Sequence, residues 1–329
     1  MSGYSDSTIM ASINCVTYNH ATYIRQALDS FLMQKTNFEY EILVHDDASN
    51  DGTGEIIKEY AEKYPDKIKP LIQTENQYSQ GIDNISGAFN FPRARGKYIF
   101  MCDGDDYWIS PDKLQKQVDY MEAHPECTLC IHSAKIELVG KAVTEGQMRP
   151  YRGNRIITPE EIVDKSSGYA MSSMAFPARL VKELPDYYVD CPVGDTPLQM
   201  MAAAAGYGYY MDQPMSAYRV GVAGSWTVEG KSGDYRKKQQ LYCERMKKVY
   251  EEFDIATNGR FHKASESAMK RTYYHTMVNT RQFKEIVNPE YRRYYKELTP
   301  RTRFFIQLQS RAPWLYKALR RIFLEKNKK

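Results

Sequence analysis

The chain has 329 residues, of which 42% are hydrophobic and 26% are charged, values close to those of soluble globular proteins. This composition excludes a chain that is mainly disordered or collagen-like. The formal net charge of +4 hides two unlike parts, because residues 1–225 carry a net charge of −10 and residues 226–329 carry +14. We therefore expect an acidic N-terminal body and a basic C-terminal region.

In the first half, apolar runs alternate with helical patterns, as expected for strands joined by crossover helices. The predicted strands are 9–17, 40–45, 68–73 and 97–102, and the predicted helices are a segment from Ile24 to Leu32, 54–64 and 110–122. This alternation predicts an α/β fold with a mostly parallel central sheet.

The next region is more mixed, and the last is helical. A capping box at Thr158–Glu161 opens a short helix, and the other predicted elements are strands 127–138, 170–176, 207–211 and 215–220 and a helix 195–205. After Trp226 the predicted helices are 235–253, 265–279, 282–297 and a last stretch from Arg301. We expect two domains, residues 1–225 and a helical basic region of residues 226–329.

Targeting and membrane-spanning segments are not expected. Residues 1–8 are small and polar, and no run of about 18 apolar residues occurs. Cys127 and Cys130 form a CxxC without a second Cys or His pair nearby, inside an apolar run that favours buried thiols over zinc. The scattered cysteines indicate a reducing, cytoplasmic location.

Two acidic segments follow predicted strands. Asp46 and Asp47 open the first, which either caps the next helix or binds a ligand such as a nucleobase. Asp103, Asp105 and Asp106 lie within four residues in the second, where they repel one another unless a cation compensates. Oxygen ligands suit Mg²⁺ or Mn²⁺, and the alternative is a solvated acidic turn. No phosphate-binding glycine loop of the GxxxxGK[ST] or GxGxxG type occurs.

Together these segments resemble family 2 glycosyltransferases, in particular the bacterial surface-polysaccharide type. The resemblance rests on Val16–Asn19, Asp46–Thr53, Arg95–Ile99 and Asp103–Trp108 (DGDDYW), and it covers residues 8–225. It implies the GT-A fold and a nucleotide-sugar donor, most often a UDP-sugar. Relatives with the same DYW ending often carry Glu where this chain has Asp103, which is a conservative difference.

The resemblance also implies roles for individual residues. Thr17, Tyr18 and Asp47 would line the base and ribose pocket, and Asp83 and Arg95 are weaker candidates for ribose or diphosphate contact. Asp105, helped by Asp103, would bind Mn²⁺ or Mg²⁺ on the diphosphate.

Family 2 enzymes generally invert the anomeric centre, with a carboxylate as the base that deprotonates the acceptor hydroxyl. By position this base is Asp195, whose alternative role is to cap a helix. Arg219 would belong to a loop that closes over the donor phosphates, or it is an ordinary surface arginine.

The C-terminal tail is a separate feature. Residues 301–329 contain nine Lys or Arg and one Glu, and residues from Pro313 form a helical pattern with Trp314 and Phe323 on its apolar side. A basic amphipathic helix of this kind is typical of attachment to an anionic membrane surface, here the cytoplasmic face, and the alternative is packing on the catalytic domain.

The resulting hypothesis is an inverting transfer of a sugar to a glycan or lipid-linked acceptor in the synthesis of lipopolysaccharide, capsule or a similar polymer. The alternatives are a nucleic-acid-binding protein that uses the basic region, which the apolar stripe of the tail disfavours, and a non-catalytic binder of nucleotide sugars.

Overall fold

The computed structural model describes residues 9–140, 146–166, 168–225, 228 and 233–315. Within these residues ten strands form one sheet in the order β3-β2-β1-β4-β9-β6-β10-β5, with β7 beside β6 and β8 beside β10. The strands are β1 Ile9–Thr17, β2 Glu39–Asp46, β3 Ile68–Ile72, β4 Tyr98–Met101, β5 Tyr107–Trp108, β6 Cys127–Leu138, β7 Gln147–Met148, β8 Arg155–Ile157, β9 Ala175–Pro177 and β10 Tyr207–Val220.

The first half of the sheet is parallel, as predicted. Strands β3, β2, β1 and β4 pair in parallel, and β1, β2 and β4 are buried along most of their length because both faces of the sheet are covered. In β4, Ile99 and Met101 enter one hydrophobic cluster while Tyr98 and Phe100 enter the other. From β9 onward the sheet is mixed, because β9 runs antiparallel to both β4 and β6, whereas β6 and β10 are parallel.

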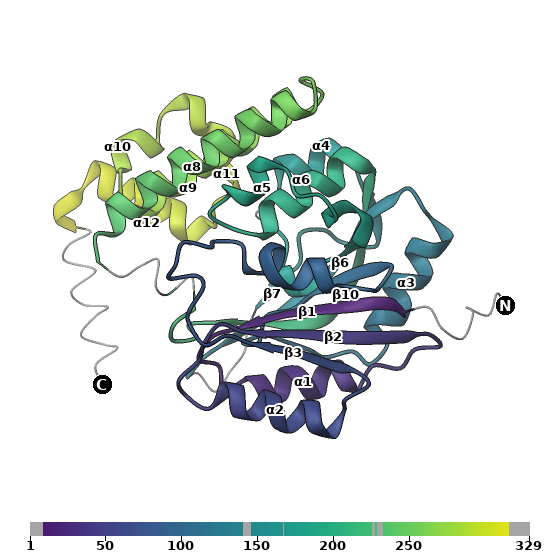
Figure 1. The fold of residues 1–329 in the computed structure, drawn as a ribbon. Helices are drawn as coiled ribbons and strands as arrows, with labels where there is room; N and C mark the ends of the chain where they lie inside the picture. The colour runs from purple at the N-terminus through teal and green to yellow at the C-terminus, as the bar shows by residue number, and fades with distance from the viewer. Residues whose placement is uncertain (1–8, 141–145, 167, 226–227, 229–232, 316–329) are drawn as a thin grey trace.

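Helices cover the two faces of this sheet (Figure 1). The first set is α1 Ile24–Leu32, α2 Thr53–Lys63 and α3 Lys113–Ala123, and the second is α4 Pro159–Asp164, α5 Asp186–Val189 and α6 Asp195–Ala205. Phe31, Ile57 and Leu114 from the first set share a core with β1 and β2. Because Ile162 and Leu198 from the second set belong to a different cluster, the sheet separates two cores.

The C-terminal helices lie on the side of the second core. They are α8 Tyr235–Ala256, α9 His262–Asn279, α10 Phe283–Ile286, α11 Arg292–Glu297 and α12 Pro300–Arg311. Val249, Phe253 and Phe261 lie in the same cluster as Leu198. Arg271 of α9 also pairs with Asp164 of α4 at 3.0 Å, so the helical region is attached to the body by apolar and ionic contacts.

Single-turn helices connect these elements. They are the π-helix η1 Ser86–Asn90 and the 3-10 helices η2 Phe91–Arg93, η3 Met171–Ser173, η4 Ala178–Val181 and η5 Pro289–Tyr291.

Two predicted elements are wrong in part. The predicted strand 170–176 is a strand only in β9, because its first half forms η3, whose carbonyls accept hydrogen bonds from the side chains of Trp108 and Gln117. The predicted helix 282–297 is broken into α10, η5 and α11. Pro289 lacks the N–H that a continuous helix needs at that point.

Other predictions are confirmed. Thr158 caps α4 by accepting a hydrogen bond from the Glu161 N–H, and each of the six cysteines is buried and free. No helix in the described ranges combines the length and the apolar character needed to cross a bilayer. The predicted tail helix lies largely in 316–329, outside the described residues, and its described part shows Trp314 73% exposed.

Candidate active site

The loops predicted to bind ligand meet at one edge of the sheet. Because β1, β2 and β4 are parallel, their carboxyl ends lie together, and open α/β sheets bind ligands there. The Asp47 N–H donates to the Thr17 carbonyl at 3.0 Å, and the Gly104 N–H donates to the Val16 carbonyl at 2.9 Å. Both acidic segments are therefore attached to the end of β1.

Gly104 allows the second segment to pack closely on β1. A Cβ atom at this position would lie 2.6 Å from Thr17 Oγ1 and 2.7 Å from Thr17 Cβ, closer than Cβ atoms approach other heavy atoms. A larger residue would push the loop, and with it Asp103 and Asp105, away from the strand end. The glycine thus serves close packing rather than an unusual backbone angle.

The three carboxylates of this segment differ in their surroundings. Asp106 is buried and accepts a hydrogen bond from the Arg219 backbone N–H at 2.8 Å, so it has a structural partner. Asp103 and Asp105 are half-buried, and His20 Nε2 lies 4.0 Å from Asp105 Oδ2, but burial lowers the pKa of His20 and so favours its neutral form. Burial, and then the charge of Asp105, raise the pKa of Asp103 to about 8. The pair lacks a compensating cation.

Asp195 is the first residue of α6 and faces the same site. Its charge also raises the pKa of Asp103, which indicates that the two carboxylates lie near each other. Burial raises the pKa of Asp195 itself, while a hydrogen bond from the Thr196 N–H at 2.8 Å opposes that rise. A carboxylate whose pKa is raised is a stronger base once ionised, as general base catalysis requires.

The first acidic segment has divided roles. Asp51 lies two residues before α2, where its Oδ1 accepts from the Thr53 N–H, and Asp46 accepts a hydrogen bond from Ser49. Asp47 is buried and accepts the N–H groups of Gln77 and Tyr78 at 2.8 and 3.1 Å.

The residues predicted to line the base and ribose pocket differ in accessibility. Thr17 is buried beneath Gly104, whereas Tyr18 is 37% exposed. The structure therefore brings Thr17, Tyr18 and Asp47 together, but only Tyr18 presents much surface.

Arg219 is a buried strand residue of β10 and not a surface or loop arginine. Its Nη1 donates to the Asp105 carbonyl at 2.6 Å, its Nη2 donates to Gln26, and its Nε pairs with Glu137 at 3.3 Å. The guanidinium carbon also lies 4.5 Å from the Tyr107 ring centroid. Arg219 therefore holds the backbone of the Asp105 loop.

Two other predicted residues lie elsewhere. Arg95 precedes β4 at the amino edge of the sheet, where its Nη2 pairs with Glu41 at 2.8 Å. It is thus separated from Asp103 by the length of the strand, and we remove it from the candidate donor site. Asp83 lies in the loop after β3, where Arg245 of α8 binds its carboxylate at 2.5 Å.

Sequence reasoning missed the residues that support the site from a distance. Asn84 donates hydrogen bonds to the carbonyls of Tyr188 and Cys191, and Arg245 reaches Asp83 across 162 residues of sequence. No local pattern marks such long-range pairs. His20 follows β1 in the sequence, and its approach to Asp105 depends on the fold.

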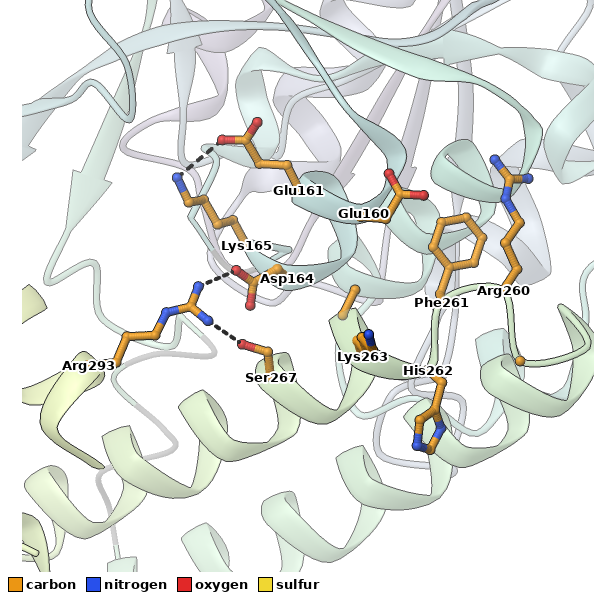
Figure 2. A pocket seen from close by; sticks show the side chains of 12 residues that line it. Glu160, Glu161, Asp164, Lys165, Arg260, Phe261, His262, Lys263, Ser267 and Arg293 are labelled. Atoms are coloured by element: carbon orange, nitrogen blue, oxygen red, sulfur yellow. Dashed lines mark hydrogen bonds and ion pairs between the residues drawn. The ribbon is translucent and has the colours of Figure 1, made fainter. Parts of the chain in front are cut away.

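A separate hollow lies between α4 and α9, away from these residues (Figure 2). It is lined by Glu160, Glu161, Asp164, Lys165, Gly259, Arg260, Phe261, His262, Lys263, Ala264, Ser267 and Arg293. Arg293 pairs with Asp164 at 2.9 Å, and Lys165 pairs with Glu161 at 3.3 Å. Its lining mixes both signs of charge and includes none of the predicted site residues.

Comparisons with known sequences identify relatives of the body. A family model described as "Glycosyl transferase family 2" matches residues 12–177. An uncharacterized protein of Mycobacterium tuberculosis is 32% identical over 221 residues, which is 65% of this chain and 60% of the relative. A Bacillus subtilis protein, TuaG, provisionally named a teichuronic acid biosynthesis glycosyltransferase, is 33% identical over 112 residues, 34% of this chain and 42% of that protein.

Solved structures share the fold at low identity. TarS of S. aureus, crystallised with UDP-GlcNAc, matches with a TM-score of 0.54 at 16% identity, over 91% of this chain and 87% of that one. The mannosyltransferase PcManGT of Pyrobaculum calidifontis, in complex with GDP-Man and Mn²⁺, matches with a TM-score of 0.51 at 18% identity, over 93% and 85%. These likenesses confirm the predicted GT-A fold.

Proposed function

Because this chain belongs to glycosyl transferase family 2, we propose that it transfers a sugar from a nucleotide-sugar donor, a UDP-sugar, to a glycan or lipid-linked acceptor in cell-surface polysaccharide synthesis. The observation that carries the proposal is the group of three carboxylates, Asp103, Asp105 and Asp195, at the carboxyl edge, none of which forms an ion pair within 4.0 Å with a described Lys or Arg. The nucleotide sugars bound by TarS and PcManGT support the donor class, and the name of TuaG supports the polymer class.

Asp103 and Asp105 would hold the divalent ion. Two oxygen-bearing side chains whose repulsion raises the pKa of Asp103 suit Mn²⁺ or Mg²⁺. Among the described residues no group of three or more His, Cys, Asp or Glu could hold an ion by itself, so donor diphosphate oxygens would complete the coordination. A bound ion would stabilise the charge on the departing diphosphate.

Asp195 would act as the general base. An inverting transfer needs one carboxylate that takes the proton of the acceptor hydroxyl while this hydroxyl attacks the anomeric carbon. Asp195 is half-buried at the start of α6, and its charge contributes to the raised pKa of Asp103. On the donor side, Tyr18 and Asp47 would contact the base and ribose, and Thr17 would support them from below, while Arg219 holds the loop of Asp105.

A thermal-shift panel tests this function. We expect at least one nucleotide sugar to raise the melting temperature of the protein in the presence of Mn²⁺, because a ligand that binds only the folded state stabilises it. A ligand at 100 times its dissociation constant adds about 2.7 kcal/mol. If no nucleotide or nucleotide sugar shifts the melting temperature, with or without Mn²⁺, the proposal fails. Salt-sensitive RNA binding in that case would favour the nucleic-acid alternative.

We also propose that residues 301–329 attach the enzyme to the cytoplasmic face of the membrane. Phe304 and Trp314 are 58% and 73% exposed, beside exposed Arg301 and Arg311. Basic residues near an anionic surface contribute about 1 kcal/mol each. Deletion of 301–329 should move the protein from vesicles that contain phosphatidylglycerol to the supernatant in a sedimentation assay. Unchanged sedimentation would contradict this attachment.

A further inference from the structure

Helix α8 joins two loops that border the candidate active site. Nη2 of Arg245 donates to Asp83 Oδ2 at 2.5 Å and to the Asp190 carbonyl at 2.9 Å. One turn further along, Lys248 pairs with the Asp190 carboxylate at 2.5 Å. Asp83 belongs to the loop after β3, and Asp190 belongs to the segment between α5 and α6. A single arginine therefore spans two loops that are more than 100 residues apart.

Both loops lead directly to proposed site residues. The loop after β3 is held at Gln77 and Tyr78 by Asp47, and the segment after Asp190 ends at Asp195 five residues later. Any shift of one loop relative to the other would change the distance between the donor side and the base.

Asn84 makes a second connection between the same loops. Its Nδ2 donates to the carbonyls of Tyr188 and Cys191 at 2.7 and 3.1 Å. A Cβ atom added to Gly194 would lie 3.1 Å from Asn84 Oδ1, so the backbone beside Asp195 packs tightly on this side chain. The two loops are thus connected twice, by the buried side-chain amide of Asn84 and by the charged side chain of Arg245 from α8.

The surface of α8 around Arg245 also faces the base. Tyr242 lies one turn before Arg245, and burial followed by the charge of Asp195 raises its pKa. Cys191, next to Asp190, contacts Met246 of the same helix at 3.8 Å between the sulfur atoms. The N-terminal half of α8 is therefore part of the wall beside Asp195, although it belongs to the basic C-terminal region.

We propose that Arg245 is a positioning residue for the transfer reaction, which fixes the loop of Asp83 against the segment that carries Asp195. The inference rests on the proposed function. Asp83 acts here as the anchor of Arg245 and not as a donor ligand. Because the Arg245 side chain is 34% exposed, its ion pair contributes little to global stability, and its effect falls on local geometry. A misplacement of about 1 Å costs up to about a hundredfold in rate.

Amide hydrogen exchange tests the geometry without any substrate. In Arg245→Met we expect faster exchange in residues 76–85 and 188–194 and unchanged exchange in β1 and β2. Lys247→Ala is the matched control, since Lys247 lies on the same helix and its ion pair among the described residues is with Glu251 of that helix, at 3.6 Å. Unchanged exchange in both loops of Arg245→Met would overturn the proposal.

Kinetics test the consequence for the reaction. With the nucleotide sugar that the thermal-shift panel identifies, release of the nucleoside diphosphate should show a kcat about tenfold lower in Arg245→Met, with a smaller change in KM. Arg245→Lys should recover most of the rate because it keeps the charge and can reach the same oxygens.

A double-mutant cycle separates the two roles of Asp83. If Asp83 only anchors Arg245, adding Asp83→Asn to Arg245→Met causes no further loss; additive losses would mean that Asp83 contacts the donor. A kcat of Arg245→Met equal to that of the wild type also overturns the proposal. If instead the wild type turns over no nucleotide sugar, the proposed function fails, and the exchange experiment still decides whether Arg245 positions the loops.

Discussion

Carboxylates at the two edges of the parallel sheet differ in the partners that the protein gives them. At the amino edge, Glu41 is 1% exposed, and it accepts hydrogen bonds from the Ser12 hydroxyl and from the backbone and side chain of Arg95. At the carboxyl edge, Asp103 and Asp105 share one loop, and Arg219 binds the backbone carbonyl of this loop, while neither carboxylate forms an ion pair within 4.0 Å with a described Lys or Arg. The protein therefore supplies the hydrogen-bond donors and the positive charge for Glu41, whereas Asp103 and Asp105 are available to a ligand.

This difference distinguishes carboxylates that stabilise the fold from carboxylates that are available to bind a ligand. A buried carboxylate with several donors is stabilised in its charged form and completes the fold. Burial, and then the charge of Asp105, raise the pKa of Asp103, so the ionised form of Asp103 costs stability in the ligand-free protein, and a cation would reverse that effect. The Arg95–Ile99 segment has a structural role at the amino edge. Its Gly96 packs against the β1 backbone, where a Cβ would lie 2.4 Å from the Ser12 nitrogen.

The largest effect is expected from Asp195→Asn at the carboxyl edge. Loss of the base should lower kcat by about 10²–10⁴-fold, while the nucleotide sugar still shifts the melting temperature. Turnover by the purified variant, measured as nucleoside diphosphate release, checks this expectation. Retained transfer to acceptor would mean that another group is the base.

Next in size is Glu41→Ala at the amino edge. It leaves Ser12 and Arg95 without their acceptor, and we expect unfolding in urea to show a loss of about 3 kcal/mol. Mn²⁺-dependent nucleotide binding by the folded variant should match that of the wild type. A variant of unchanged stability with weakened nucleotide binding would reverse the roles of the two edges.

Asp105→Asn should have a moderate effect on nucleotide binding, and not on folding stability as Glu41→Ala has. Removing one of two metal-binding carboxylates should weaken Mn²⁺-dependent nucleotide binding by at least about tenfold, which corresponds to about 1.4 kcal/mol. The folding stability without metal should not fall, because the change removes repulsion from Asp103. Calorimetric titration with and without Mn²⁺ measures the binding, and equal affinity in both proteins would contradict the metal assignment.

Arg95→Met should have the smallest effect. The Arg95 side chain is 59% exposed, so its pair with Glu41 contributes less than about 1 kcal/mol. Nucleotide affinity should be the same as in the wild type, because Arg95 lies at the amino edge of the sheet and Asp103 follows the opposite end of β4. A loss of diphosphate affinity in this variant would restore the role that the family resemblance implied.

Much of the fold could be predicted because its local signals are strong. The predicted ranges of β1, β6 and α6 coincide with the observed ones, since each is an apolar run or helix bounded by a turn or cap. The segment 170–176 could not be predicted in this way, because buried side chains of Trp108 and Gln117 bind its carbonyls and replace a strand ladder. Burial and partners from distant segments overrode the local pattern there.

The amino-acid sequence by itself determined the alternation of strands and helices, the acidic strand ends and the family. These depend on periodicity and on residues that are neighbours in the chain. Only the tertiary structure decided which charges are left without partners. Arg95, Arg219 and Asp83 each pair with a residue at least 54 positions away, whereas the carboxylates of Asp103 and Asp105 form no ion pair within 4.0 Å with a Lys or Arg among the described residues. Such pairing depends on which loops the sheet brings together, and no stretch of sequence contains it.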